Sequence, residues 1–294
     1  MSDAAGSYYL PEPSKWPLVG SIGLFLTTGG FAYALTSGVD GGMGSMTIMY
    51  VGFAILAYML FGWFGQVIDE SEAGKYDAQV DTSFRMGMMW FIFSEVMFFA
   101  AFFGALFYVR QLSGPWLDGA GNNALTGSIL WPDFKFEWPM MNTPGEGYDK
   151  PESVIGAWGI PFYNTLILLT SGLTVTWAHW GLKKDNRKQL IIGLFLTVAL
   201  GLIFVVMQAY EYVHAYQDLN LTLASGTYGS TFFMLTGFHG LHVTIGAIML
   251  LVMLIRSIKG HFSEKNHFAF EAAAWYWHFV DVVWLGLFVV VYWL

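Results

Sequence analysis

The sequence predicts an all-α, polytopic membrane protein with seven transmembrane helices. Of its 294 residues, 55% are hydrophobic and 12% are charged, whereas soluble domains carry about 25% charged residues. Aromatic side chains make up 18% of the chain, which suits surfaces that face acyl chains and the membrane interface. Apolar runs of about 20 residues, the length that crosses a hydrocarbon layer of roughly 30 Å, recur throughout.

The runs are continuous and do not alternate every second residue, so they predict helices and not strands of a membrane barrel. We expect a two-helix unit over residues 1–70, a five-helix bundle over 71–294, and a polar external loop at about 111–160 rich in Gly, Pro, Asn and Trp. The seven helices are predicted at 16–36, 46–66, 83–109, 161–182, 189–214, 228–256 and 268–294.

Charge and cysteine content exclude several functions. The net charge of -8 gives no basic surface for nucleic acid. The chain has no Cys, so a disulfide, a thiolate-held cluster or a blue-copper centre is not available to it. With the helices as placed, ten Lys and Arg lie on the side of the N-terminus and three on the other. This bias predicts a cytoplasmic N-terminus and, with seven crossings, an external C-terminus.

Glu95 is the first candidate functional residue. It lies in the middle of the third predicted helix, with no basic residue within a turn or two. Ionisable residues inside the membrane are costly and mark functional sites, and desolvation there favours the neutral acid. A proton-carrying role and a structural role, in which Ser94 or another helix satisfies the carboxyl, both stay open.

The fifth and sixth predicted helices each carry a pair of polar residues three positions apart. Glu211 and His214 form one copy of a Glu-x-x-His pair, but a di-iron site needs two copies and two further Glu. His239 and His242 could ligate haem or copper, although their flanking glycines favour close helix packing. We therefore expect interhelical polar contacts from these four residues and no metal site in the chain.

The seventh predicted helix carries a polar stripe. Glu271, Trp275, His278 and, nearly, Asp281 share one face at spacings of four, three and three. Such a face points toward other helices, so we expect an interhelical polar network there and no catalytic residue. Arg256, Lys259, His261 and His267 gather between helices six and seven, where they suit anionic lipid headgroups or an ordinary positive-inside loop.

Several motifs resemble cytochrome c oxidase subunit III. The resemblance covers most of the chain and is densest at 83–109 and from 161 onward. Its motifs run from Ser94 to Phe99, Thr176 to His179, Asp185 to Lys188, Tyr228 to Phe233, Thr236 to Val243 and Phe270 to Leu285.

The resemblance implies a two-plus-five helix bundle with a lipid-filled cleft. It also implies a subunit that binds phospholipid but no redox metal, with haem a, haem a3 and copper in partner subunits I and II. Subunit I would be the main contact, and cytochrome c would bind the complex and not mainly this chain. The implied role is to support proton uptake, lipid retention and stability of the catalytic subunit in a bacterial inner membrane. Glu95 matches the family's carbodiimide-reactive acid.

Two departures limit what the resemblance implies. Gly65 and Gln66 stand where the family commonly has an Arg-Asp pair, so lipid-headgroup contacts in this region are expected only at Trp63 and Glu70. The stretch around Trp131 lacks the usual second proline, so contacts of the external loop do not transfer. A subunit III-like component of a quinol oxidase or nitric oxide reductase system, and a standalone proton-coupled membrane protein, are the alternative functions.

Overall fold

The computed structural model describes residues 12–37, 42–145, 147–148 and 150–294, with backbone alone for 42–45. These residues form helices and connecting segments without a strand, which confirms the all-α prediction for the described part of the chain. Two compact units are present, unit 1 over Met1–Phe84 and unit 2 over Arg85–Leu294. The boundary between these two units lies within the third long helix, and the division at residue 70 stays a prediction.

Unit 1 holds two long helices, α1 (Trp16–Thr36) and α2 (Gly42–Glu72), and the start of α3 (Ala78–Tyr108). Glycines let the backbones of α1 and α2 approach closely. A Cβ atom added at Gly30 would lie 2.4 Å from the backbone N of Met49, and one at Gly52 would lie 2.4 Å from the backbone N of Thr27. At these two positions backbone lies against backbone, with no room for a larger residue.

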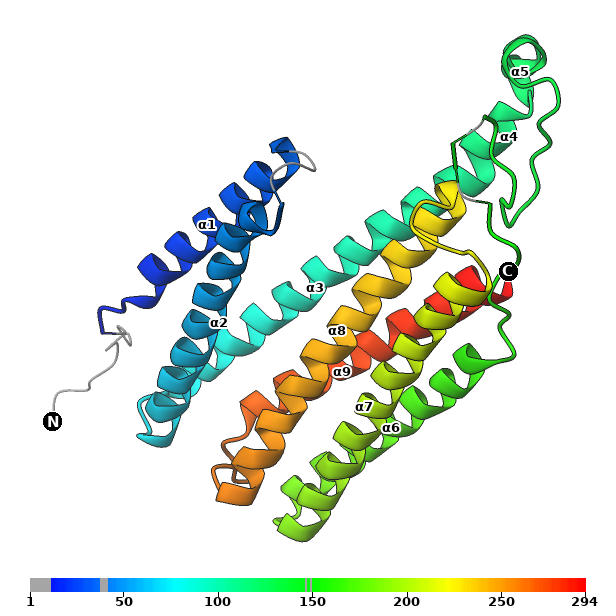
Figure 1. The fold of residues 1–294 in the computed structure, drawn as a ribbon. Helices are drawn as coiled ribbons and strands as arrows, with labels where there is room; N and C mark the ends of the chain where they lie inside the picture. The colour runs from blue at the N-terminus through cyan, green and yellow to red at the C-terminus, as the bar shows by residue number, and fades with distance from the viewer. Residues whose placement is uncertain (1–11, 38–41, 146, 149) are drawn as a thin grey trace, which may run out of the picture. The chain divides into compact units, whose positions relative to one another are not determined.

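Unit 2 contains the rest of α3 and four further long helices that run side by side (Figure 1). α6 packs on α7 and α9, and α8 packs on α7 and α9. The remaining elements are a π-helical turn, two short helices and a 3-10 turn after α3, and a π-helical end after α9. The long helices are α6 (Ile160–Lys183), α7 (Arg187–Asp218), α8 (Gly226–Lys259) and α9 (Phe268–Leu287). The short elements are η2 (Val109–Ser113), α4 (Gly114–Leu117), η3 (Gly121–Asn123), α5 (Ala124–Leu130) and η4 (Phe288–Trp293).

Short connections join the helices of unit 2. Between α6 and α7, Asp185 adopts a positive φ of 52°, and the side chain of Asn186 caps α7 by accepting the N–H of Gln189. α8 ends at Gly260, whose φ of 89° is the left-handed conformation that suits glycine at a helix end. These tight turns make neighbouring helices antiparallel and bring α6, α7, α8 and α9 together.

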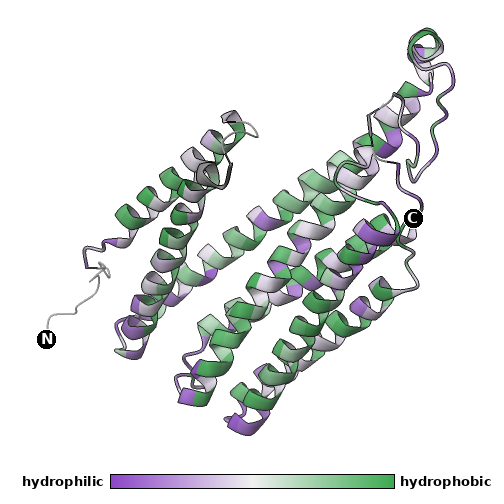
Figure 2. Ribbon diagram, viewed as in Figure 1, coloured by the Kyte–Doolittle hydropathy of each residue, from purple (hydrophilic) through white to green (hydrophobic). Residues whose placement is uncertain are grey.

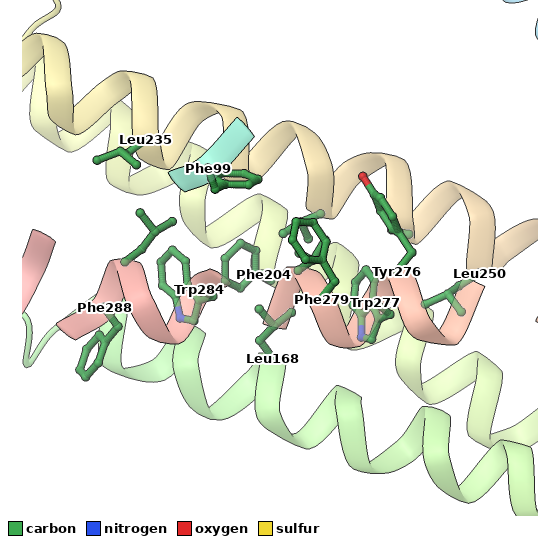
Figure 3. Packing of buried hydrophobic residues seen from close by; sticks show 14 of the residues in the cluster. Phe99, Leu168, Phe204, Leu235, Leu250, Tyr276, Trp277, Phe279, Trp284 and Phe288 are labelled. Carbon is green, nitrogen blue, oxygen red and sulfur yellow. The ribbon is translucent and has the colours of Figure 1, made fainter. Parts of the chain in front are cut away.

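The core of unit 2 lies along α9. Tyr276, Trp277 and Trp284 are almost fully buried, and Leu168 of α6 and Phe204 of α7 pack beside them (Figure 3). The outer faces of the helices are apolar as well, and their polar residues gather at the helix ends (Figure 2). A fold that is apolar inside and outside is expected of helices surrounded by lipid.

Among the residues that the structure describes, six helices are long and apolar enough to cross a membrane by length and composition. The sequence predicted seven crossings. The long helix α6 is not among these six candidate crossings. It carries several polar residues, among them Asn164, Ser171 and His179. The helical class is thus confirmed for the described residues, while the seventh crossing and the two-plus-five arrangement stay predictions.

The segment predicted as the external loop contains α4, η3, α5 and a long irregular stretch. The carboxylate of Asp118 accepts the backbone N–H of Phe136 at 3.1 Å and Nζ–H of Lys135 at 3.1 Å. These two donors hold the pKa of Asp118 below its ordinary value. They also pin the end of α4 to the irregular stretch, beside a cavity of about 530 Å³ lined by residues between Leu130 and Lys150.

We expect Asp118→Asn to speed protease cleavage between Trp131 and Gly145 several-fold. Asparagine keeps the size of the side chain but removes the charge that strengthens both hydrogen bonds. Limited proteolysis followed by mass spectrometry measures the change. Asp133→Asn, which removes an exposed carboxylate from the same loop, is the matched control. Equal cleavage rates in the two variants would contradict a pinning role for Asp118.

Candidate functional site

The acid singled out by the sequence, Glu95, meets a histidine from another helix. Oε2 of Glu95 on α3 lies 2.9 Å from Nε2 of His242 on α8. The two side chains are 20% and 11% exposed. The rings of Phe98, Phe99 and Tyr276 surround His242, with centroids at 5.8, 5.0 and 6.4 Å. Aromatic walls therefore shield the pair from most other polar groups of the bundle.

The hydrogen bonds of His242 fix where its protons are. Nδ1 lies 2.6 Å from the carbonyl oxygen of Phe238, and a carbonyl can only accept, so Nδ1–H is the donor. The bond between Nε2 and Glu95 must then contain one further proton. It is carried either by a neutral carboxyl or by an imidazolium facing a carboxylate. In both forms the pair is neutral and holds one exchangeable proton.

Ser94, the possible partner of Glu95 within the same helix, makes a different contact. Ser94 Oγ donates to the carbonyl oxygen of Phe91 at 2.7 Å. Of the two structural partners that the sequence left open for Glu95, the hydrogen bond observed is the one to another helix. Sequence alone could not identify it, because His242 is 147 positions away.

A second set of predicted residues lies deeper in the bundle. His239 is fully buried, and its Nε2–H donates to the carbonyl oxygen of Val280 at 3.1 Å. His278 Nε2 lies 3.3 Å from Thr176 Oγ1 on α6. Asp281 is 9% exposed and faces Gly172 of α6. These contacts connect α9 to α6 and α8.

Two tryptophans of α9 add indole contacts that the sequence analysis missed. Trp277 Nε1–H donates to Ser171 Oγ at 2.9 Å, and Trp284 Nε1–H donates to Thr165 Oγ1 at 2.9 Å. Both acceptors are on α6. The polar residues of α6 therefore satisfy buried donors of its neighbour. Trp, Ser and Thr within apolar runs were the available signal.

The predicted Glu211 and His214 pair is divided between two partners. Glu211 is fully buried, and its Oε1 accepts Tyr292 O–H from η4 at 2.6 Å. His214 is 43% exposed on its side chain, and its Nδ1 lies 2.7 Å from Asp218 on the same helix. Glu211 thus makes a contact between helices, whereas the contact of His214 lies within α7.

The first residue of the α9 stripe, Glu271, lies among basic groups. Arg85 of α3 donates to its Oε2. Its Oε1 lies 3.5 Å from His179 Nε2 and 3.3 Å from His267 Nε2. Arg85 and His179 were not among the predicted site residues. Arg85 had only been counted as a charge on one side of the membrane.

The remaining lipid candidates have varied surroundings. In unit 1, Trp63 is 47% exposed, and Glu70 accepts hydrogen bonds from Gln66 and Tyr76. In unit 2, Arg256 is buried and lies 4.6 Å from the ring of Phe262. His261 follows the left-handed turn at the end of α8. Their contact with lipid stays a prediction.

These features define a class of protein: a helical, multi-span membrane protein in which several ionisable groups, among them Glu95 and Glu211, make contacts between helices. A sequence model of the family described as cytochrome c oxidase subunit III matches residues 6–143 and 149–294. The chain belongs to the cytochrome c oxidase subunit III family, and so it is a subunit of a multi-subunit oxidase of the respiratory chain.

Relatives match over nearly their whole length. The chain is 41% identical to cytochrome c oxidase subunit 3 of Latimeria chalumnae over 294 residues, which cover 100% of this chain and 99% of the relative. It is 43% identical to the Marchantia polymorpha protein of the same name, over 97% of this chain and 96% of the relative. The Cyprinus carpio protein of that name is 42% identical over 100% of this chain and 99% of the relative.

Proposed function

We propose that this chain supports proton uptake, lipid retention and stability of the catalytic subunit while the oxidase reduces oxygen. Subunit I is its proposed main contact and subunit II a second one. The redox groups, haem a, haem a3 and copper, belong to those partner subunits, and cytochrome c binds the complex and not mainly this chain. Family membership supports the assembly, and the Glu95–His242 pair supports the proton role.

The pair suits proton exchange because its proton can move between the two groups without changing the net charge of the pair. Glu95 Oε2 and His242 Nε2 lie 2.9 Å apart, so the proton can pass along one hydrogen bond and leave the net charge of the pair at zero. One-fifth exposure of the Glu95 side chain gives a proton donor access to the carboxyl. His242 is fixed by Phe238 and aromatic rings, so the acceptor nitrogen is already oriented.

We expect Glu95→Gln to slow proton uptake and shorten the active lifetime of the oxidase. The amide can still donate to His242 Nε2, so the helix contact is kept while the exchangeable proton is lost. The decrease should be several-fold, below the roughly 10²–10⁴-fold loss of a positioned general acid or base. Proton uptake and turnovers before inactivation, measured with the purified complex in vesicles, give the result.

Glu137→Gln, at an exposed acid of the loop, is the matched control. Subunit content and the haem spectrum show whether each variant complex is assembled. An assembled Glu95→Gln complex with native proton uptake and native lifetime would refute the proton role of the pair.

The proposed topology has seven crossings, with α6 as the seventh. At 1.5 Å per residue its 24 residues span about 36 Å, enough for a hydrocarbon core of roughly 30 Å. Basic residues at the joined ends of α6 and α7 and of α8 and α9 support a cytoplasmic N-terminus and a periplasmic C-terminus. The bacterial inner membrane stays a prediction.

Co-purification tests the assembly. The tagged chain, extracted in mild detergent, should bring haem a, copper, two large partner subunits and phospholipid, seen by optical spectrum and mass spectrometry. Isolation without partners, together with proton flux through vesicles containing this chain alone, would favour a standalone proton-coupled protein.

A further inference from the structure

Three buried polar side chains lie in the core of unit 2, on the facing helices α6 and α7. Asn164 of α6 and Glu211 of α7 are fully buried, and Gln208 of α7 is 6% exposed. Both polar atoms of each amide, and Oε2 of Glu211, are buried and form no hydrogen bond with any described residue. Buried polar groups without a partner are uncommon in folded proteins, and each requires a physical explanation.

The antiparallel packing of α6 and α7 brings these three side chains to one level of the bundle. Thr174 Oγ1 of α6 lies 2.8 Å from Thr197 Oγ1 of α7. Because the two helices run in opposite directions, going back along α6 from Thr174 to Asn164 corresponds to going forward along α7 from Thr197 to the turn that holds Gln208. Gln208 and Glu211 are three positions apart, so they share one face of α7. We call the three side chains the polar layer.

Tyr292 of η4 supplies one hydrogen bond to the polar layer. Its O–H donates to Glu211 Oε1 at 2.6 Å. Its ring lies 5.5 Å from that of Phe232 and 5.8 Å from that of Trp284, and the residue is 8% exposed. Aromatic packing therefore fixes the phenol beside Glu211 and away from lipid.

The surroundings of Glu211 indicate a neutral carboxylic acid. Tyr292 is the partner of one oxygen, and the other has none among the described residues, so neither is paired with Lys or Arg. The nearest histidine along α7, His214, is already bound to Asp218 at 2.7 Å. A carboxylate buried without a cation is costly, so the group keeps its proton. Since the Tyr292 hydroxyl occupies Oε1, the proton belongs on Oε2, which then needs an acceptor.

Water matches the groups of the polar layer that need partners. They comprise amide N–H donors, amide carbonyl acceptors and one carboxyl O–H donor, and a water molecule both donates and accepts. Buried waters make about three hydrogen bonds to such groups. Gly240 of α8 leaves room beside Gln208, because an added Cβ would lie 3.8 Å from Gln208 Cγ. The Gln208 amide also lies near the phenols of Tyr212 and Tyr292, without the geometry of a hydrogen bond.

We propose that Asn164, Gln208 and Glu211 bind internal water, to which Glu211 donates as a neutral carboxylic acid. The water completes the hydrogen bonds of both amides and joins α6 to α7, while Tyr292 joins η4 to the same acid. The polar layer thus holds an exchangeable proton inside the bundle. It uses neither residue of the Glu95–His242 pair and does not depend on the proposed proton role.

Infrared spectroscopy of the purified, assembled oxidase complex in H₂O and D₂O tests this site. We expect Glu211→Gln to remove one C=O band of a neutral carboxylic acid, a band that shifts when the native complex is transferred to D₂O. Gln208→Leu should remove an O–H band of internal water, identified by its shift in water enriched in heavy oxygen. Glu152→Gln and Gln217→Leu, at exposed positions, are the matched controls and should leave both bands in place.

Tyr292→Phe keeps the experiment decisive if the other variants fail to assemble. It removes only the O–H that bonds Glu211 Oε1, so the neutral-acid band should shift to higher frequency. A map of the native complex that resolves ordered waters should place one within hydrogen-bond distance of both Gln208 and Glu211. The proposal is overturned by a Glu211→Gln complex that retains every neutral-acid band, by an unshifted band in Tyr292→Phe, or by a direct Asn164–Gln208 hydrogen bond without water in that map.

Discussion

Replacing Trp277 with alanine should lower the free energy of unfolding of unit 2 by about 3–5 kcal/mol, the range for removing a large aromatic side chain from a packed core. Trp277 is fully buried and lies against three helices at once. Its indole N–H bonds Ser171 of α6. Its ring fills the space left by Gly201 of α7 and Gly246 of α8, where an added Cβ would lie 2.6 and 2.8 Å from it.

Unfolding of the full chain in detergent micelles by increasing fractions of SDS measures this change. Trp90→Ala is the matched control, because Trp90 is 68% exposed and truncation there should change the free energy by about 0.5 kcal/mol or less. Similar losses in the two variants would show that Trp277 is not the central packing residue of the bundle.

Gly30→Val should separate α1 from α2 at a cost of up to about 3 kcal/mol, the upper part of the range for overpacking. The first added carbon would lie 2.4 Å from the backbone N of Met49, and a backbone atom cannot move aside as a flexible side chain can. The adjacent residue offers the control, since a Cβ at Gly29 would meet nothing within 4 Å.

Crosslinking reports the separation because the chain contains no natural Cys. Gly20→Cys and Met59→Cys place two thiols across the interface, where a Cβ at Gly20 would lie 3.3 Å from Met59 Cε. The yield with a short bifunctional reagent should fall in Gly30→Val and stay unchanged in Gly29→Val. Equal yields would mean that the α1–α2 contact tolerates a branched side chain.

Which residues share one face of a helix could be predicted, because that depends only on spacing along a single helix. Glu271, Trp275, His278 and, nearly, Asp281 formed the predicted stripe. Glu271, His278 and Asp281 contact or face groups of other helices, whereas the ring of Trp275 lies 6.3 Å from that of Phe268 on the same helix. Glu211 and His214 show where this reasoning stops. Their three-residue spacing suggested a common site, yet one meets Tyr292 and the other Asp218.

The sequence by itself determined the helical membrane class, the positions of the long helices, the isolation of Glu95 and the resemblance to the family. Each of these follows from local composition or from motifs along the chain. Only the tertiary structure decided that Glu95 meets His242 and that His179, His267 and Glu271 converge. Contacts between helices depend on the rotation and axial offset of each helix, which are set by side-chain packing across the whole bundle.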